Sequence, residues 1–170
     1  MKTQHHHRQS ALADLIDGAI AGAIATWVMG KATSYLYERE DEATRGREER
    51  VRGGKTAYGV AAEKAAHLVD AELSKDERQR YGGDIHWALG VGTGALYGLL
   101  RDRVPQAGLA RGLAFGAAFW LLVDEGANTA LGLTPGPTTF PWQTHARGLA
   151  GHLVYGTMAD TALAALQPTA

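Results

Sequence analysis

The chain has 170 residues, a formal net charge of −1 and no cysteine. The near-neutral charge excludes a nucleic-acid-binding protein, which needs a strongly basic face, and the lack of cysteine excludes disulfides, thiolate nucleophiles and cysteine-ligated metal centres. The mean hydropathy of −0.19 is that of an average soluble protein, but the charges are unevenly spread. Residues 38–84 hold 10 of the 17 lysines and arginines and 12 of the 18 acids, so the rest of the chain is mostly small and apolar.

Four apolar stretches lie outside this polar segment. A helix needs about 20 apolar residues, in a range of roughly 17–25, to cross the hydrocarbon core of a bilayer. The sequence therefore predicts an all-α polytopic membrane protein built as a four-helix transmembrane bundle. We expect an N-terminal tail at 1–14, transmembrane helices at 15–37, 85–103, 109–133 and 146–166, a polar helical insert at 38–84 and a C-terminal tail at 167–170.

Two of these stretches invite other interpretations. The first follows Lys2 and Arg8 as a signal peptide would, but its length and the acids Asp14 and Asp17 argue against cleavage. The second is short, although Arg101 at its end can extend its side chain to the headgroups. A soluble four-helix bundle is the general alternative. It would need a polar face on each helix, and the run LAFGAAFWLLV at 113–123 has none.

The insert is itself expected to be helical. Residues 38–52 are of mixed charge and form either a solvated helix or a disordered segment, and residues 57–73 have the spacing of an amphipathic helix that lies on the membrane surface or caps the bundle. Ser74 and Glu77 predict a capping box that opens a further short helix, which Gly82-Gly83 would end. We favour an ordinary solvated hairpin of helices as the interpretation of the insert, because amphipathicity requires no ligand.

Small or polar residues recur at every fourth position of each apolar stretch. Membrane helices gain little from packing large apolar side chains together, so small residues that allow close backbone approach mark the helix contacts. Ionisable residues within the same stripes are expected to face the bundle interior rather than lipid. The glycines that we assign to helix packing are Gly18, Gly22, Gly90, Gly94, Gly98, Gly112, Gly116, Gly148 and Gly156.

His86, Asp124 and His152 occupy these stripes. In four antiparallel helices, Lys31, Glu125 and these three residues fall near the same end of the bundle. At a rise of 1.5 Å per residue, six residues from a helix end is roughly 9 Å of depth. We therefore predict a buried polar layer of Lys31, His86, Asp124, Glu125 and His152, with His145 above it. A second set, Asp17, Arg101, Arg111 and Asp160, lies near the opposite end and is expected to form plain salt bridges.

The layer has three interpretations. In the first it is structural, with Lys31 neutralising a carboxylate and His152 hydrogen-bonding between helices. In the second it handles protons or cations, because histidine titrates near pH 6.5. In the third His86, Asp124 and His152 bind a metal ion, although Lys31 would repel a cation, and haem ligation is disfavoured because the two histidines lie at different depths. No cofactor is predicted, and the run His5–His7 is assigned to a tail without function.

The order of three segments resembles a known family. The chain is similar in this order to the YagU-like inner-membrane proteins of bacteria, a family of unknown function. The segments are His86-Trp87 at the start of a glycine-rich stretch, GLTPGPTTFPW at 132–142 and GHLVYG at 151–156. The resemblance covers about the last 90 residues and the first apolar stretch. It implies a bacterial inner-membrane location and about four spans, but no activity. His86 and His152 match polar positions of that family, whereas Asp124 stands where some members have histidine.

The charge of the loops gives the orientation. The compact loop RDRVPQAGLAR at 101–111 indicates cytoplasmic N- and C-termini by the positive-inside rule, with the polar layer toward the outer face. We expect a multi-pass protein of the bacterial inner membrane that acts as a proton- or cation-responsive transporter or channel. The alternatives are an accessory subunit, packing in the bilayer as a homo-oligomer or against a membrane-protein partner, and a metal-binding membrane protein. An enzyme is the least supported class, because the chain has no evident nucleophile and no phosphate-binding loop.

Overall fold

The computed structural model describes residues 10–104, 106 and 108–167, which contain helices and turns but no strand. The predicted all-α class is confirmed. The tails predicted at 1–14 and 167–170 lie partly outside the described residues, and the run His5–His7 lies wholly outside them. The elements in chain order are α1 (Ala11–Glu38), α2 (Glu42–Arg52), α3 (Ala57–His67), α4 (Lys75–Leu100), α5 (Leu113–Phe119), the π-helix η1 (Trp120–Ala127), α6 (Asn128–Ala130), the 3-10 helix η2 (Pro137–Thr139) and α7 (Trp142–Leu166).

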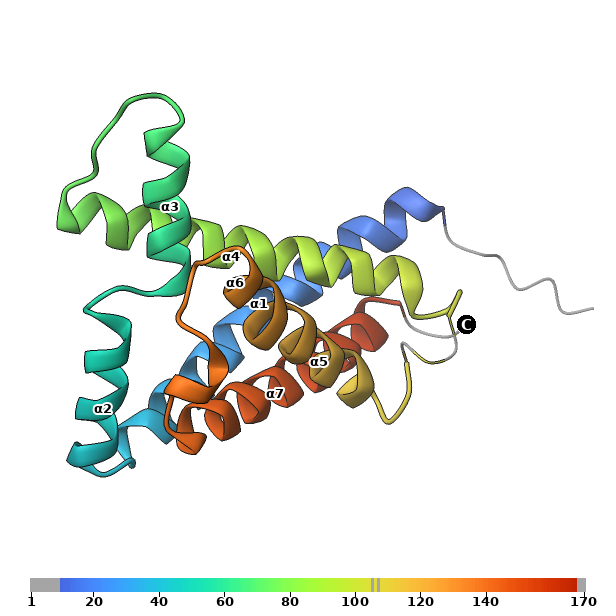
Figure 1. Cartoon of the computed structure of the whole chain (residues 1–170). Coiled ribbons are helices and arrows are strands. Elements are labelled where there is room, and N and C mark those ends of the chain that lie inside the picture. The colour runs from blue at the N-terminus through green and yellow to red at the C-terminus, as the bar shows by residue number, and fades with distance from the viewer. Residues whose placement is uncertain (1–9, 105, 107, 168–170) are drawn as a thin grey trace, which may run out of the picture.

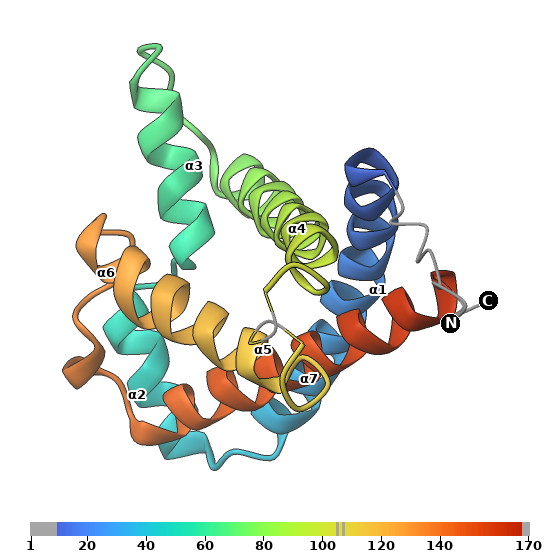
Figure 2. The same ribbon diagram turned by 90° about the vertical axis from the view of Figure 1, so that its right-hand side faces the viewer.

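Four helical segments run alongside one another in alternating directions. They are α1, α4, the continuous segment made by α5, η1 and α6, and α7 (Figure 1). The start of α1 and the end of α7 share one end of the molecule, as Figure 2 shows from that side. At the other end, α2 and α3 run crosswise to α1 and α7 (Figure 1). The insert therefore covers one end of the antiparallel segments.

The helix starts of the insert are capped by side chains. Asp41 accepts a hydrogen bond from the Thr44 backbone N–H at 2.9 Å and so caps α2. Ser74 and Glu77 form the predicted capping box at the start of α4. Such caps satisfy backbone donors that have no partner within the helix, each stabilising it by about 1 kcal/mol. The capping-box prediction is confirmed.

The prediction that Gly82-Gly83 ends this helix is wrong. The α4 helix continues from Lys75 to Leu100 without interruption. Gly82 is buried where α3 crosses α4, and a Cβ atom on it would lie 2.8 Å from the backbone nitrogen of Gly59. The glycine permits this crossing. In a helix, glycine is about 1 kcal/mol less favourable than alanine, and the packing against α3 offsets this cost.

The third segment starts later than predicted and changes its winding. Ala110, Arg111 and Gly112 all have positive φ, of 51°, 57° and 80°, so the helix begins at Leu113 rather than at 109. From Trp120 to Ala127 it is a π-helix. Such segments are rare and often occur at functional sites. This one carries both Asp124 and Glu125.

Glycines form the contact between α1 and α4. A Cβ atom on Gly94 would lie 2.3 Å from the Cα of Gly22, and one on Gly98 would lie 2.2 Å from the carbonyl oxygen of Asp14. Cβ contacts with backbone atoms at such distances would overlap strongly. Gly18 meets Gly94 in the same way, and Gly90 faces the side chain of Thr26. These positions therefore require glycine for the two helices to lie in backbone contact.

A second glycine contact joins α5 and α7. A Cβ atom on Gly112 would lie 2.2 Å from the Gly156 carbonyl oxygen, and one on Gly116 would lie 2.1 Å from that of His152. Gly148 is less tightly enclosed, with the Trp120 Nε1 atom 3.0 Å from its Cβ position. The stripe positions at every fourth residue thus lie against neighbouring helices in both pairs, although a Cβ on Gly30 would meet nothing within 4 Å.

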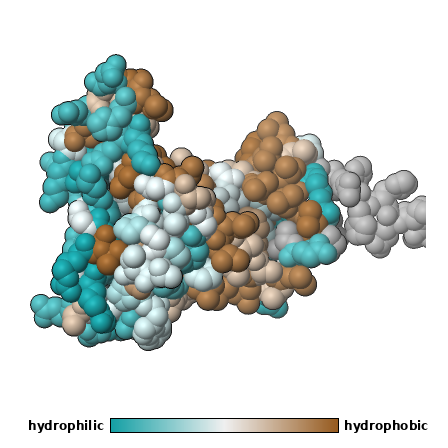
Figure 3. Space-filling model, in the orientation of Figure 1, coloured by the Kyte–Doolittle hydropathy of each residue, from teal (hydrophilic) through white to brown (hydrophobic). Residues whose placement is uncertain are grey.

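Small residues make up much of the fully buried core. Apart from Tyr97, Tyr155 and Leu163, the buried apolar core consists of alanines, and Thr26, Asn128, His152 and Asp160 are buried among them. Many large apolar side chains are exposed, and Figure 3 shows brown patches along the bundle and also on the insert, to which the exposed Leu68 and Val69 belong. On α1 the exposed stripe consists of Leu12, Ile16, Ile20, Ile24, Trp27 and Tyr35.

By length and composition, α1 is the one described helix that passes as a membrane span. Of its most apolar window, 33% is buried inside the protein. The other three segments carry more polar residues or, in the case of the third, change their winding. A buried core helix or a signal sequence meets the same criterion, and the criterion does not show the four predicted spans.

Candidate functional site: a polar cavity beneath the insert

A cavity of about 900 Å³ lies between the insert and the ends of the bundle helices. Part of its lining comes from exposed residues of the insert, among them Glu49 and Lys55. The deeper walls are half-buried and are supplied by separate elements. They include Tyr58 of α3, His86 of α4, Asp124 and Glu125 of η1, and His145 of α7.

The Glu125 carboxylate faces the His145 ring. The His145 Nδ1 atom lies 2.7 Å from Glu125 Oε1, and its Nε2 atom lies 2.9 Å from the carbonyl oxygen of Pro137. A carbonyl can only accept, so Nε2 carries a hydrogen. The contact to Glu125 then needs another proton, held either as imidazolium with carboxylate or as imidazole with carboxylic acid. The pair is therefore a binding site for one proton.

Asp124 lies beside the buried ring of His152. The His152 Nδ1 atom is 3.7 Å from Asp124 Oδ2 and 2.9 Å from the carbonyl oxygen of Gly148. Nδ1 therefore carries a hydrogen shared toward the carbonyl, and a second proton on Nε2 would make the ring a counter-ion for Asp124. His152 is 2% exposed, and the Phe119 ring packs edge-on against it with ring centroids 4.9 Å apart.

His86 of α4 completes the group and contacts Tyr58 of α3. Its ring packs at a tilt on that of Tyr58, with centroids 5.2 Å apart. Burial raises the pKa of Tyr58, the negative charge of Asp124 raises it further, and a hydrogen bond with Asn128 opposes the rise. Tyr58 is thus a neutral hydroxyl facing the same space as His86 and Asp124, and it ties the insert to the wall of the cavity.

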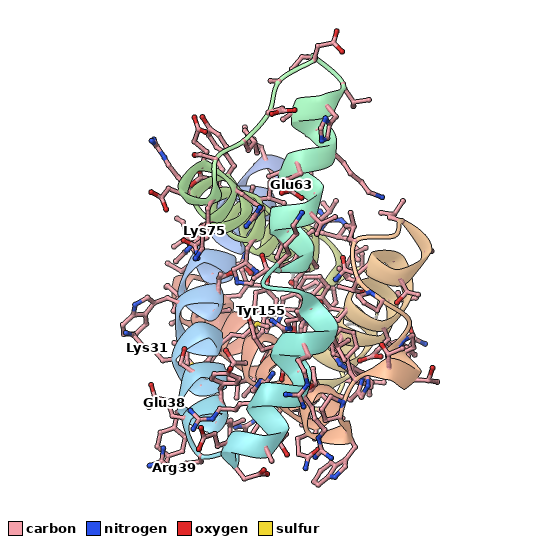
Figure 4. All side chains as sticks on the ribbon, turned by 60° about the vertical axis from the view of Figure 1, so that its left-hand side comes forward. Lys31, Glu38, Arg39, Glu63, Lys75 and Tyr155 are labelled. Carbon is pink, nitrogen blue, oxygen red and sulfur yellow. The ribbon has the colours of Figure 1, made fainter. Side chains whose placement is uncertain are left out.

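Lys31 was predicted to belong to this layer, and the structure places it elsewhere. It is exposed and points away from the bundle in Figure 4, with its Nζ atom 6.0 Å from the centre of the Trp27 ring. The exposed face of α1 contains Trp27, Lys31 and Tyr35, spaced four residues apart. The Lys31 side chain projects from the outer face of α1, so it neutralises neither Asp124 nor Glu125.

A charge network holds the insert against α7. Arg147 donates to both oxygens of Glu48, at 2.7 and 2.6 Å, and also to Glu40. Glu48 additionally pairs with Arg52 at 2.6 Å and accepts a hydrogen bond from Thr144 at 2.8 Å. Burial acts to raise the pKa of Glu48, but the Arg147 hydrogen bonds and the Arg52 charge outweigh it and hold the pKa below its usual value. Glu48 is therefore held as a carboxylate by its arginine partners.

In the second polar set, Arg101 and Asp160 form one of the predicted salt bridges, whereas Asp17 and Arg111 do not pair with each other. Asp160 accepts hydrogen bonds from Arg101 and from the Tyr97 hydroxyl, both at 2.7 Å. Asp17 accepts one from Gln167 at 3.2 Å rather than forming an ion pair among the described residues. Arg111, in its turn of positive φ, has no acidic partner in residues 10–104, 106 and 108–167. Arg103 pairs instead with Asp14 at 2.8 Å.

The residues proposed for a metal do not form a ligand set. Among the described residues, no group of three histidine, aspartate or glutamate side chains could hold a metal ion. Asp124 and His152 approach each other most closely, but the nearer ring nitrogen of His152 is committed to the Gly148 carbonyl.

Sequence reasoning missed three parts of the site. Tyr58 and the Arg147–Glu48 pair come from the insert and its docking, and no spacing signal marks such contacts. The π-helix was also missed, because propensity and hydrophobic period do not distinguish it from an α-helix. For Glu48, the sequence offered one hint: it is an acid among the arginines of the insert, and Arg147 is the one lysine or arginine in the last apolar stretch.

The chain was compared with known proteins at the level of families, single sequences and structures. No protein-family model, curated protein or solved structure matches it. Function is therefore argued from the geometry of the site.

Proposed function

We propose that this chain is an integral membrane protein whose cavity binds protons, or a small cation, and that it works as a proton- or cation-responsive transporter or channel. The observation that carries the proposal is the pairing at the cavity floor. Asp124 and Glu125 each face a histidine, and neither forms an ion pair with a lysine or arginine of the described chain. A carboxylate beside histidine exchanges protons near neutral pH, where a carboxylate beside arginine does not.

Membrane insertion is supported by the outward-facing apolar side chains. Soluble monomers rarely expose contiguous large apolar patches, and such patches mark contact with lipid or a partner. Here they cover the outside of helices whose inner faces are joined through glycine, as expected where lipid supplies the apolar surroundings. Four spans with both termini on the cytoplasmic side fit the shared end of α1 and α7. The resemblance of residues 132–142 and 151–156 to the YagU-like inner-membrane proteins supports membership of that family and an inner-membrane location, but no particular activity.

The proposed response is a change of charge under the insert. Loss of the proton shared by Glu125 and His145 leaves a net negative charge in that pair. Asp124, in the neighbouring position of the π-helix, then faces a second negative group. Like charges at close range repel, so deprotonation favours either opening of the insert or protonation of Asp124 through His152. Either outcome couples proton occupancy to the shape of the cavity.

Proton flux in liposomes tests this function. The purified chain is reconstituted with an internal pH-sensitive dye, and an imposed pH gradient is followed as it decays. We expect the native protein to dissipate the gradient faster than protein-free liposomes, and the Asp124→Asn and Glu125→Gln variants to fall to the protein-free rate. Glu72→Gln, which removes an exposed acid outside the cavity, serves as the matched control.

Two outcomes would count against the proposal. A His152→Ala, Glu125→Gln double variant that carried the native flux would show that these groups are not on the path. A folded native protein with no flux of protons or alkali cations would instead favour the accessory-subunit alternative, in which the glycine-lined helices and apolar faces serve assembly.

A further inference from the structure

A second hollow lies beside the cavity, on the outer side of α2. This groove has a volume of about 660 Å³ and lies between α2 and the segment that leads into α7. Its basic wall is formed by Arg47 and Arg50. Its apolar wall is formed by Phe140, Pro141 and Trp142. The proposed function makes no use of it.

The two arginines are free to bind an anion. Arg47 and Arg50 are three residues apart on α2, a spacing that places them on one face of the helix. Both are exposed, and neither pairs with a carboxylate in the part of the chain that the structure describes, whereas Arg52 of the same helix is held by Glu48. Arg47 donates to the Thr44 hydroxyl at 3.2 Å, and its charge helps to lower the pKa of the nearby Asp41 carboxyl, with which it forms no ion pair among the described residues. Guanidinium groups match the oxygens of a phosphate group.

The opposite wall favours a ligand with an apolar part. Trp142 is the first residue of α7, and its side chain is 72% exposed. Tryptophan at the end of a membrane helix belongs to the interfacial belt, at the level of the headgroups. Because α2 runs crosswise to α1 and α7 (Figure 1), it would lie along the membrane surface if those helices cross the bilayer. The arginines and Trp142 would then meet the phosphate and the upper acyl chain of one lipid.

We infer that this groove binds the headgroup of an anionic phospholipid, with its phosphate on Arg47 and Arg50 and its acyl chain along Trp142. The inference rests on the proposed membrane location but not on proton handling. Arginine side chains at a membrane surface attract anionic lipids, and their guanidinium groups match the phosphate oxygens of the headgroup. A soluble phosphate would use only the two exposed arginines, where salt screens the interaction.

Lipid selectivity of the purified full chain provides the test. Native mass spectrometry in detergent would compare retention of phosphatidylglycerol with that of phosphatidylcholine of the same acyl chains. We expect the native protein to prefer phosphatidylglycerol. The Arg47→Gln, Arg50→Gln variant should lose roughly 30-fold in this preference, because each of the two arginines contributes about 1 kcal/mol at a lipid surface. Lys75→Gln, Arg80→Gln is the matched control, because it removes two exposed positive charges from the same end of the molecule (Figure 4 labels Lys75).

The possible results separate the sources of binding. Equal losses in the two double variants would mean that general surface charge attracts the lipid, and would overturn the inference. Displacement of phosphatidylglycerol by millimolar inorganic phosphate would identify a free-phosphate site instead, and would overturn it too. Failure of lipid selectivity with intact proton flux refutes this inference alone, whereas a protein that is soluble without detergent refutes the membrane location on which both proposals rest.

Discussion

Replacement of Gly94 by alanine perturbs a close backbone contact between α1 and α4. The new Cβ atom would lie 2.3 Å from the Gly22 Cα and 2.5 Å from the Gly18 carbonyl oxygen. Carbon atoms in favourable contact are about 3.5–4.0 Å apart, so the two helices must separate by roughly 1.2 Å or more. Overpacking of this kind costs about 1–3 kcal/mol. Backbone atoms cannot move aside as a side chain can, so we expect a cost near the upper end of that range.

Gly92→Ala is the matched control on the same helix. A Cβ atom there meets nothing within 4 Å, so the substitution should simply improve helix propensity, by roughly 1 kcal/mol. The same gain applies at Gly94, where it leaves a net loss of about 2 kcal/mol. The two variants should therefore differ by about 3 kcal/mol, which for a protein of this size is roughly 6–12 °C in Tm.

Thermal unfolding in detergent, followed by circular dichroism, measures this difference. The reasoning predicts opposite signs for the two variants relative to the native protein. Equal Tm values for Gly94→Ala and Gly92→Ala would refute the conclusion that α1 and α4 lie in backbone contact.

The remaining predictions concern a buried charge and a buried hydroxyl. The folded pKa of Glu48 is lowered, so its contribution to stability is present above the unfolded value of about 4.3 and is lost as pH falls through the folded value. Unfolding by denaturant should therefore find the native protein more stable than Glu48→Gln at pH 7, with the difference shrinking below about pH 4; a pH-independent difference would contradict the pairing with Arg147. Tyr155→Phe removes a 2.6 Å hydrogen bond to the Gly90 carbonyl and should lower the unfolding free energy by about 1 kcal/mol, whereas no change would mean that the bond contributes nothing.

Much of the site could be predicted from the sequence because helical spacing is a local property. Residues four apart share a helix face whatever the rest of the chain does. The stripes therefore predicted which glycines face a neighbouring helix, and they placed His86, Asp124 and His152 toward one end. The cap at Ser74 is equally local, since its partner Glu77 is three residues away.

Only the tertiary structure decided which charges meet. Lys31 has the depth of the polar layer but projects from the outer face of α1, and Glu125 pairs with His145 instead. Glu48 lies 99 residues from its partner Arg147, and their meeting depends on how the insert docks across the end of the bundle. The π-helix that presents Asp124 and Glu125 depends likewise on packing around it. Spacing determines the face of a helix, whereas the partner on that face is set by long-range packing, which leaves no periodic trace in the sequence.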